Sequence, residues 1–256
     1  MKAAEIISYM EGLRNEEQRR VLMRFFKTGP GEYGEGDEFL GLKVPQTREV
    51  VRMTVGDTPT GEIAELMASR WHEVRLCGLL MLVWNFERMA MKRMADDAEA
   101  MARRDELVMT YLELADRANN WDLVDLTAPK ILGHWLMLPS ALGGRAYKTQ
   151  VLDRLAASPC LWRQRMSIVC TWKPLQMGDA SWCLRYAELH LHHSHDLMHK
   201  AVGWMLREMG KRVGMDLLRD FLSRHAREMP RTMLRYAIER MDEGERQQWL
   251  CSSREV

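Results

Sequence analysis

The sequence lacks any apolar run close to the roughly 18 to 20 residues that a helix needs to cross a bilayer. Its start, Met1-Lys2-Ala3-Ala4-Glu5-Ile6-Ile7, soon reaches Glu11 and Arg14, so the apolar core of a signal peptide is missing as well. Both absences argue against a membrane protein and against a secreted one. We therefore expect a cytoplasmic protein with no membrane partner.

Cysteine is scarce and unpaired. The chain has five cysteines and no Cys-x-x-Cys pair: Cys77, Cys160, Cys170, Cys183 and Cys251. The odd count and the wide spacing argue against a disulfide framework and against a zinc ribbon. Reduced thiols packed among helices are the expected state.

Strand signals are nearly absent. Apolar and polar residues seldom alternate, and no Asn-Gly hairpin turn occurs, whereas Leu, Met, Ala, Glu and Arg dominate. The 21 methionines are scattered along the chain. That distribution favours gap-filling between helices over a methionine-rich copper site. The composition predicts an all-α protein.

A large basic excess is missing too, because 37 Lys and Arg stand against 36 Asp and Glu and leave a net charge of +1. By itself this total argues against a nucleic-acid-binding protein. The charges are unevenly distributed, however. Acidic residues gather early, at Glu11, Glu16, Glu17, Glu32, Glu35, Asp37 and Glu38, and basic residues gather late, at Arg207, Lys211, Arg212, Arg224, Arg227, Arg231 and Arg235. A locally basic face is compatible with the balanced sum.

Apolar periodicity predicts a series of helices separated by short breaks. The expected helices are 3–26, 45–55, 60–69, 71–90, 94–117, 120–137, 146–156, 160–173, 178–190, 194–210, 212–225, 229–240 and 242–250. Breaks are expected at residues 56–59, 143–144, 173–174 and 229–230, and a glycine-rich acidic loop at 29–41. A chain of 256 residues suits one large domain or two small ones, and we expect a single domain over 1–256.

Five helix starts resemble one another, which indicates repeats. They are Glu73–Leu76, Trp121–Val124, Trp162–Arg165, His199–Val202 and Arg231–Leu234, and successive starts lie 48, 41, 37 and 32 residues apart. Helix pairs at intervals near 40 residues are typical of HEAT-like or armadillo-like repeats. Such repeats stack into a curved right-handed α-solenoid with a concave face. An irregular helical bundle is the alternative.

Trp121 and Asp125 form the first candidate pair. They are spaced i, i+4, so they share one face of a helix for which Asn120 is a plausible N-cap. An indole can pack against a sugar, and a carboxylate can stabilise positive charge. Taken alone, the pair is better explained as a core tryptophan and a surface aspartate.

Arg165 and a basic stripe are the next candidates. Arg165 stands at the start of a later helix, where its planar guanidinium could clamp a phosphate or form a salt bridge to a neighbouring helix. Lys200, Trp204, Arg207 and Lys211 fall at i, i+4, i+7 and i+11, which is one helical stripe. Three cations around an indole suit a nucleic-acid backbone.

Together these elements resemble the AlkD-like DNA alkylation-repair family of HEAT-like-repeat glycosylases. The resemblance runs in order through most of the chain. It covers residues 27–37 and 39–45, the WDxVD element at Trp121–Asp125, the WxxR element at Trp162–Arg165, the GWxLRE element at Gly203–Glu208, and residues 234–239.

The resemblance implies a site made of Trp121, Asp125, Arg165 and Trp204. It also matches Arg48, Arg207 and Lys211 to positions that contact DNA phosphates, although the segment before Arg48 only approximates the family's proline-containing helix start. With Lys200 from the stripe, these are the expected DNA-binding residues. No cofactor and no metal is implied.

The reaction implied is hydrolysis of the N-glycosidic bond of N3- or N7-alkylated purines in duplex DNA, as the first step of base excision repair. The expected enzyme is a monomer associated with the bacterial nucleoid, with no obligate protein partner. A concave helical stack offers no obvious pocket, and the resemblance implies an enzyme that acts on the sugar and backbone without base flipping. The alternatives are a non-catalytic HEAT-like protein that binds branched or damaged DNA, and a protein-binding scaffold.

A histidine cluster stands outside this scheme. His190, His192, His193, His195 and His199 crowd a predicted turn between two helices. Imidazoles are common metal ligands, but no cysteine or carboxylate motif accompanies them. We expect a solvated loop in preference to a metal site.

Overall fold

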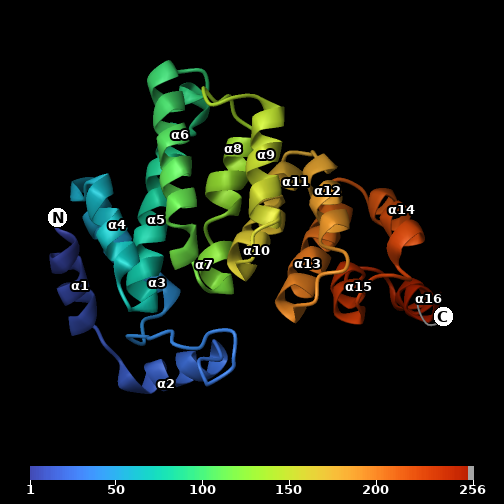
Figure 1. Ribbon diagram of the computed structural model, residues 1–256, viewed down its shortest axis with the longest axis horizontal. Helices are drawn as coiled ribbons and strands as arrows, with labels where there is room; N and C mark the ends of the chain where they lie inside the picture. The colour runs from blue at the N-terminus through green and yellow to red at the C-terminus, as the bar shows by residue number, and fades with distance from the viewer. Residues whose placement is uncertain (253–256) are drawn as a thin grey trace. The chain divides into compact units, whose positions relative to one another are not determined.

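The computed structural model describes residues 1–252, and over that range it contains helices and no strand (Figure 1). The single extended pairing among these residues is an isolated parallel bridge between Glu38 and Trp71. The expected all-α class is confirmed.

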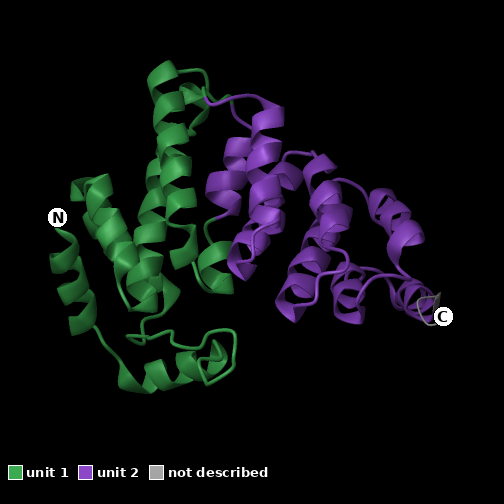
Figure 2. Ribbon diagram, viewed as in Figure 1, with its two compact units in different colours: residues 1–127, 139–141 green, residues 128–138, 142–256 purple. Residues whose placement is uncertain are grey.

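The chain forms two compact units (Figure 2). The first comprises residues 1–127 and 139–141, and the second comprises residues 128–138 and the chain from Leu142 onward. The division into units leaves open whether residues 1–256 act as one domain, so that expectation stays a prediction.

The first unit contains seven α-helices. They are α1 (Ala3–Gly12), α2 (Glu16–Phe25), α3 (Val44–Thr54), α4 (Thr60–Ala68), α5 (His72–Met89), α6 (Ala98–Glu113) and α7 (Trp121–Asp125). Three short 3-10 turns separate some of them: η1 (Val55–Asp57), η2 (Lys92–Met94) and η3 (Ala115–Arg117).

Helix α5 is the centre of the first unit, where α3, α4 and α6 pack against it. It is buried along most of its length because it is apolar on nearly every side. Three residues of its first turn, His72, Glu73 and Arg75, are polar and nevertheless at most 3% exposed. Buried polar groups need partners, so the start of α5 must be a polar centre.

The second unit begins with a π-helical turn, η4. Its elements are η4 (Pro129–Gly133), α8 (His134–Leu136), α9 (Arg145–Ala156), α10 (Leu161–Val169), α11 (Trp172–Gln176), α12 (Ser181–Leu189), α13 (Asp196–Arg212), α14 (Met215–His225), α15 (Arg231–Ala237) and α16 (Glu243–Ser252). Here α13 is central and packs against α10, α12, α14 and α15. In both units helices pack on their near neighbours in the chain, which is the arrangement of an α-solenoid.

Three predicted helices are interrupted. The segment 3–26 is two helices, because Asn15 ends the first run and caps α2 by accepting a hydrogen bond from the amide of Gln18 at 2.9 Å. In the segment 120–137, the first helix ends at Asp125, and a new helical turn begins at Pro129, which cannot donate a backbone hydrogen bond. The break expected at 173–174 instead precedes Trp172, because Pro174 lies in the first turn of α11, where proline is tolerated.

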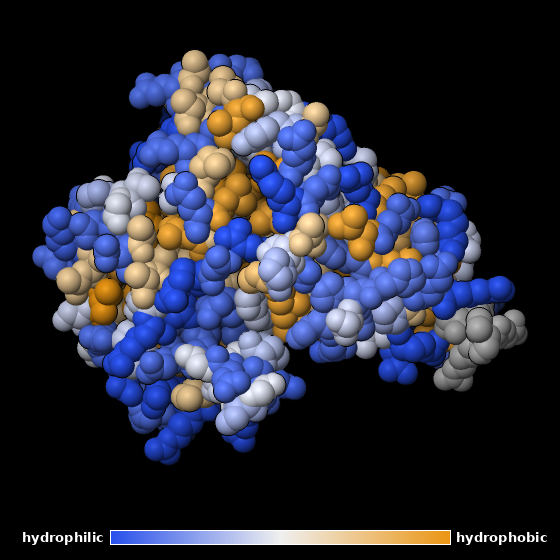
Figure 3. All heavy atoms as spheres, viewed as in Figure 1, coloured by the Kyte–Doolittle hydropathy of each residue, from blue (hydrophilic) through white to orange (hydrophobic). Residues whose placement is uncertain are grey.

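Four of the five repeated starts are confirmed as helix starts, because they lie at the beginnings of α5, α7, α10 and α15. The fifth, His199–Val202, lies inside α13, which begins at Asp196. The thiols Cys77, Cys170 and Cys183 are buried and reduced, as expected. Among the described residues no helix is long and apolar enough to cross a membrane. The face shown in Figure 3 is covered mainly by polar and charged residues, with apolar residues in separate patches.

Candidate active site

Helix α7 places Trp121 and Asp125 on the wall of one pocket. The pocket has a volume of about 360 Å³ and lies within the first unit. Both side chains are partly exposed, whereas Leu123 and Val124 between them are buried in the core. The i, i+4 spacing therefore does put the candidate pair on one accessible face. The expectation that the helical stack offers no obvious pocket is wrong.

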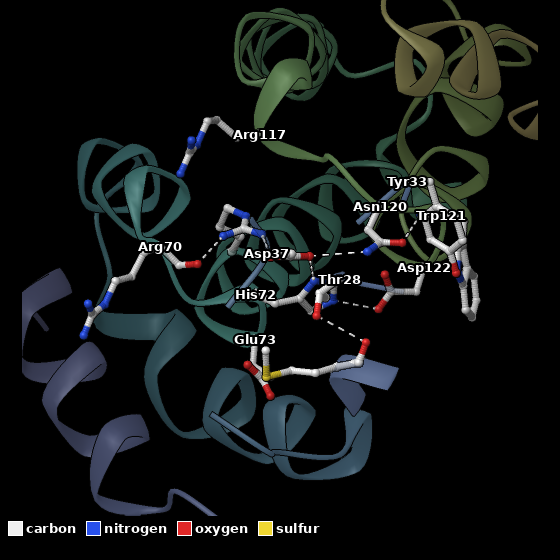
Figure 4. A network of polar contacts seen from close by, with 12 residues as sticks. Thr28, Tyr33, Asp37, Arg70, His72, Glu73, Arg117, Asn120, Trp121 and Asp122 are labelled. Atoms are coloured by element: carbon white, nitrogen blue, oxygen red, sulfur yellow. Dashed lines mark hydrogen bonds and ion pairs between the residues drawn. The ribbon is translucent and has the colours of Figure 1, made fainter. Parts of the chain in front are cut away.

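Aromatic rings from α2 and the loop after it surround Trp121. Phe25 meets the indole edge-on at 5.8 Å between ring centroids, and Phe26 lies tilted against it at 5.2 Å. The indole Nε1 donates a hydrogen bond to the hydroxyl of Tyr33 at 3.3 Å (Figure 4). These contacts hold the plane of Trp121 while leaving part of the indole in the open pocket.

A buried charge network centred on His72 adjoins the pocket, and His72 and Asp122 form part of the pocket lining (Figure 4). The Nδ1 of His72 is 2.7 Å from Oδ2 of Asp37, and its Nε2 is 2.9 Å from Oδ2 of Asp122. Arg75 donates to the other oxygen of Asp37 at 2.5 Å, and Asn120 donates to Asp37 at 3.3 Å. The network therefore connects the loop before α3, the start of α5 and the start of α7.

The charges in this network control its protonation. Burial acts to lower the pKa of His72, but the charges and hydrogen bonds of Asp122 and Asp37 outweigh it and raise the pKa to about 9. Burial likewise acts to raise the pKa of Asp37, but His72 and Arg75 outweigh it and hold that pKa below its usual value. At neutral pH, His72 is thus an imidazolium between two carboxylates.

Glu73 organises the loop beside the pocket. Its carboxylate accepts hydrogen bonds from the backbone amides of Leu40, Gly41 and Leu42 at 2.8 to 3.0 Å. Gly41 has a φ of 90° and could not carry a Cβ, which would lie 2.1 Å from the carbonyl oxygen of Asn15. The glycine-rich loop is therefore a fixed wall of the pocket.

Arg165 belongs to the second unit, in α10. It is only 5% exposed, and its Nη1 donates a hydrogen bond to the carbonyl of Leu197 at 2.6 Å. Leu197 lies in the first turn of α13, the helix that carries Trp204. The structure thus places Arg165 and Trp204 on two helices that pack together.

The stripe along α13 is real but mostly paired within the protein. Lys200 contacts Asp196 at 2.7 Å, and Arg207 forms an ion pair with Glu239. Lys211 is exposed, and no ion pair involves it among residues 1–252. Arg48, on α3 of the first unit, is likewise exposed. Of the four expected DNA-binding residues, Lys211 and Arg48 are therefore the two that are exposed and in no ion pair within residues 1–252.

Gly203 serves helix packing. A Cβ at this position would lie 2.4 Å from the carbonyl oxygen of Met233 and 2.5 Å from Cβ of Tyr236. Both atoms belong to α15, so the glycine lets α15 approach α13 closely.

The histidine cluster forms hydrogen bonds within the protein. His190 is 3% exposed and bonds Ser167 at 2.8 Å, and His193 bonds Gln164 at 2.8 Å. Burial, together with His193, lowers the pKa of His190 to about 4. His190 is therefore not part of a solvated loop. No group of three or more potential ligands within residues 1–252 could hold a metal ion.

The sequence did not identify His72, Asp37, Asn120 and Asp122 as members of a site. The missed signal is a polar first turn, His72-Glu73-Val74-Arg75, before the long apolar run of the same helix. Such a turn must meet partners elsewhere in the chain. The four expected site residues are divided two and two between the units, and their assembly into one site stays a prediction.

Comparison with known proteins gives a family and a fold. Residues 6–241 match the family model described as DNA alkylation repair enzyme. Among solved structures, the chain is similar to one described as a predicted DNA alkylation repair enzyme from Enterococcus faecalis, with a TM-score of 0.64 and 13% identity. That match covers 90% of this chain and 97% of the other. No curated protein matches.

The structural match extends over most of both chains, so the helical-repeat fold expected from the sequence is confirmed. The family model spans most of the chain, including α7, α10 and α13 with the candidate residues they carry. The chain therefore belongs to the DNA alkylation repair enzyme family.

Proposed function

We propose that this protein is a DNA glycosylase that removes N3- and N7-alkylated purines from duplex DNA. The observation that carries the proposal is the joint position of Trp121 and Asp125 on the wall of one pocket, with a carboxylate and an indole both accessible. Membership of the repair family supplies the substrate class, and the pocket supplies a site for the chemistry.

The reaction needs stabilisation of a cation more than it needs an acid. Alkylation at N3 or N7 puts positive charge on the purine, which leaves as a neutral base, while the deoxyribose develops oxocarbenium character. Asp125 stabilises that charge and orients the attacking water. The indole faces of Trp121 and Trp204 favour positive charge at the sugar. Arg165 holds the neighbouring phosphate.

The accessible cations support DNA as the partner. Arg48 and Lys211 contact phosphates directly, and Lys200 and Arg207 do so after exchanging their carboxylate partners for DNA. The resemblance further implies that the damaged base stays outside the protein. The volume of the pocket falls in the range of small-molecule sites, so the place of the base is a question for experiment.

The test is release of damaged bases from alkylated duplex DNA. Wild type is expected to release 7-methylguanine, and the Asp125→Asn variant is expected to lose at least about 100-fold in rate, as for removal of an electrostatic catalyst. If wild type also releases an N3 adduct that is too bulky for the pocket, the damaged base stays outside the protein during the reaction. Wild-type binding that weakens steeply with salt, without any release, identifies the non-catalytic alternative. Absence of salt-sensitive binding identifies the scaffold.

A further inference from the structure

Helix α7 is too short to hold its own direction. It has five residues, about one and a half turns, and a helix of that length is unstable by itself because nucleation is unfavourable. Trp121 and Asp125 occupy its two ends. Contacts from other elements must therefore fix the direction in which these two side chains face the pocket.

Besides the core packing of Leu123 and Val124, buried polar contacts hold the N-terminal end of α7. Asn120 is fully buried, and its side-chain oxygen accepts a hydrogen bond from the amide of Trp121 at 2.9 Å. Asp122 is 6% exposed and reaches His72 through Oδ2. Its other oxygen is buried with no hydrogen-bond partner among residues 1–252. His72 is thus the one side chain in this range that holds the Asp122 carboxylate.

Both nitrogens of His72 must carry a proton. Each one faces a carboxylate oxygen within 2.9 Å, and an ionised carboxylate only accepts hydrogen bonds. A neutral imidazole could satisfy only one of the two. The ring is also held sterically, stacked on Phe39 at 4.4 Å between centroids and tilted against Phe26 at 5.1 Å. His72 is a rigid, doubly donating connector between Asp37 and Asp122.

The network is electrically balanced. His72 and Arg75 carry two positive charges, and Asp37 and Asp122 carry two negative ones, all at least nine-tenths buried. Loss of the His72 charge leaves a buried carboxylate without its counter-charge or its donor, and such a group is strongly unfavourable. Asp122 then either takes up a proton or moves toward solvent, and both changes alter the contact that holds the first turn of α7.

We propose that His72 is a positioning residue for the reaction: as an imidazolium between Asp37 and Asp122, it fixes the first turn of α7 and thereby directs Trp121 and Asp125 into the pocket. The proposal rests on the proposed glycosylase function. It assigns His72 no contact with DNA, since the ring is 2% exposed.

The first test uses the His72→Gln variant, which keeps one donor and loses the charge. Single-turnover release of 7-methylguanine at pH 7 is expected to fall by 10- to 100-fold, while the Kd for alkylated duplex DNA changes less than threefold. Misplacement of a reacting group by about 1 Å costs this much. The matched control is Val74→Ala, a fully buried change on the same helix that does not line the pocket. It is expected to lower stability and to leave the rate within threefold.

The pH profile separates positioning from mere stability. The charged groups around His72 are Asp37 from the loop, Asp122 from α7, and Glu73 and Arg75 from its own helix. Wild-type turnover is expected to fall as the pH passes about 9, the pKa of His72. In Asp37→Asn, which keeps the contact with Asp122, this fall is expected at least one pH unit lower.

A release rate of His72→Gln within threefold of wild type overturns the proposal. A defect of His72→Gln that lies entirely in the Kd for DNA overturns it too. So does an alkaline fall in turnover that occurs at the same pH in Asp37→Asn as in wild type. If wild type itself releases no base, the proposed function fails, and NMR then decides the positioning. Nitrogen-15 shifts are expected to show an imidazolium at pH 7, and His72→Gln is expected to displace the amide signals of residues 121–125. A neutral ring, or unmoved amides, contradicts the inference in that case too.

Discussion

Two buried histidines have opposite electrostatic environments. His72 lies between carboxylates in the first unit, and its pKa is raised to about 9. His190 lies beside Ser167 and His193 in the second unit, where burial, with His193, lowers its pKa to about 4. The residue type is the same, so the difference comes entirely from the partners that the fold supplies. Each histidine makes folding stability depend on pH, with opposite sign.

We predict that stability declines on both sides of neutrality through these two residues. For His72 the native pKa is above the unfolded value of about 6.5, so its contribution is complete below pH 6.5 and is lost as the pH rises toward 9. For His190 the native pKa is below the unfolded value, so stability is lost as the pH falls from about 6.5 toward 4. Each shift corresponds to about 3 kcal/mol.

Urea unfolding between pH 4 and pH 9.5 measures both effects. His190→Gln is expected to reduce the loss of unfolding free energy at acid pH alone, and His72→Gln is expected to reduce its loss at alkaline pH alone. Each variant serves as the control for the other. An acid side that persists unchanged in His190→Gln would show that other groups cause it.

At the scale of elements, most helices and four of the five repeated starts could be predicted from the sequence, because apolar periodicity and helix-start residues are local signals. The break at residues 13–15 was missed, since the composition there stays favourable to helix and a cap decides the matter. The brevity of α7 was missed because it depends on Pro129 and on partners elsewhere in the chain. Trp121 and Asp125 could be predicted from their i, i+4 spacing, whereas Asp37 joins His72 only in three dimensions.

Helix packing in the second unit yields a sharp prediction at Gly203. Gly203→Ala forces a methyl group against the backbone of α15 and is expected to destabilise the protein by about 1 to 3 kcal/mol, as overpacking does. The control is Gly61→Ala in α4, where a Cβ meets no atom within 4 Å. That change is expected to be neutral or to stabilise by up to about 1 kcal/mol. Equal effects of the two changes in urea unfolding would refute the packing role of Gly203.

At the scale of the whole molecule, the net charge of +1 hides accessible cations in both units. Arg48 and Lys211 have no ion pair among residues 1–252, whereas Arg207 pairs with Glu239. Binding to DNA releases counterions for each phosphate contacted, so affinity should depend on salt despite the balanced total. The distribution of charge, and not its sum, determines whether this chain can bind DNA.

Lys211→Ala is expected to weaken binding to duplex DNA similarly for all sequences. The slope of log K against log salt should decrease by about one, the value for one phosphate contact. The control is Lys92→Ala, which removes an equally exposed positive charge from η2. If both variants change the slope equally, Lys211 has no specific contact and contributes only to the overall charge.

The central claim is that Asp125 stabilises the sugar cation during base removal. Its most direct test is the single-turnover rate of 7-methylguanine release from alkylated duplex DNA by wild type and by Asp125→Asn, which has nearly the same shape without the charge. We expect measurable release by wild type and a loss of at least about 100-fold in the variant, with little change in DNA affinity. Equal rates for the two proteins, or no release by wild type, would contradict it.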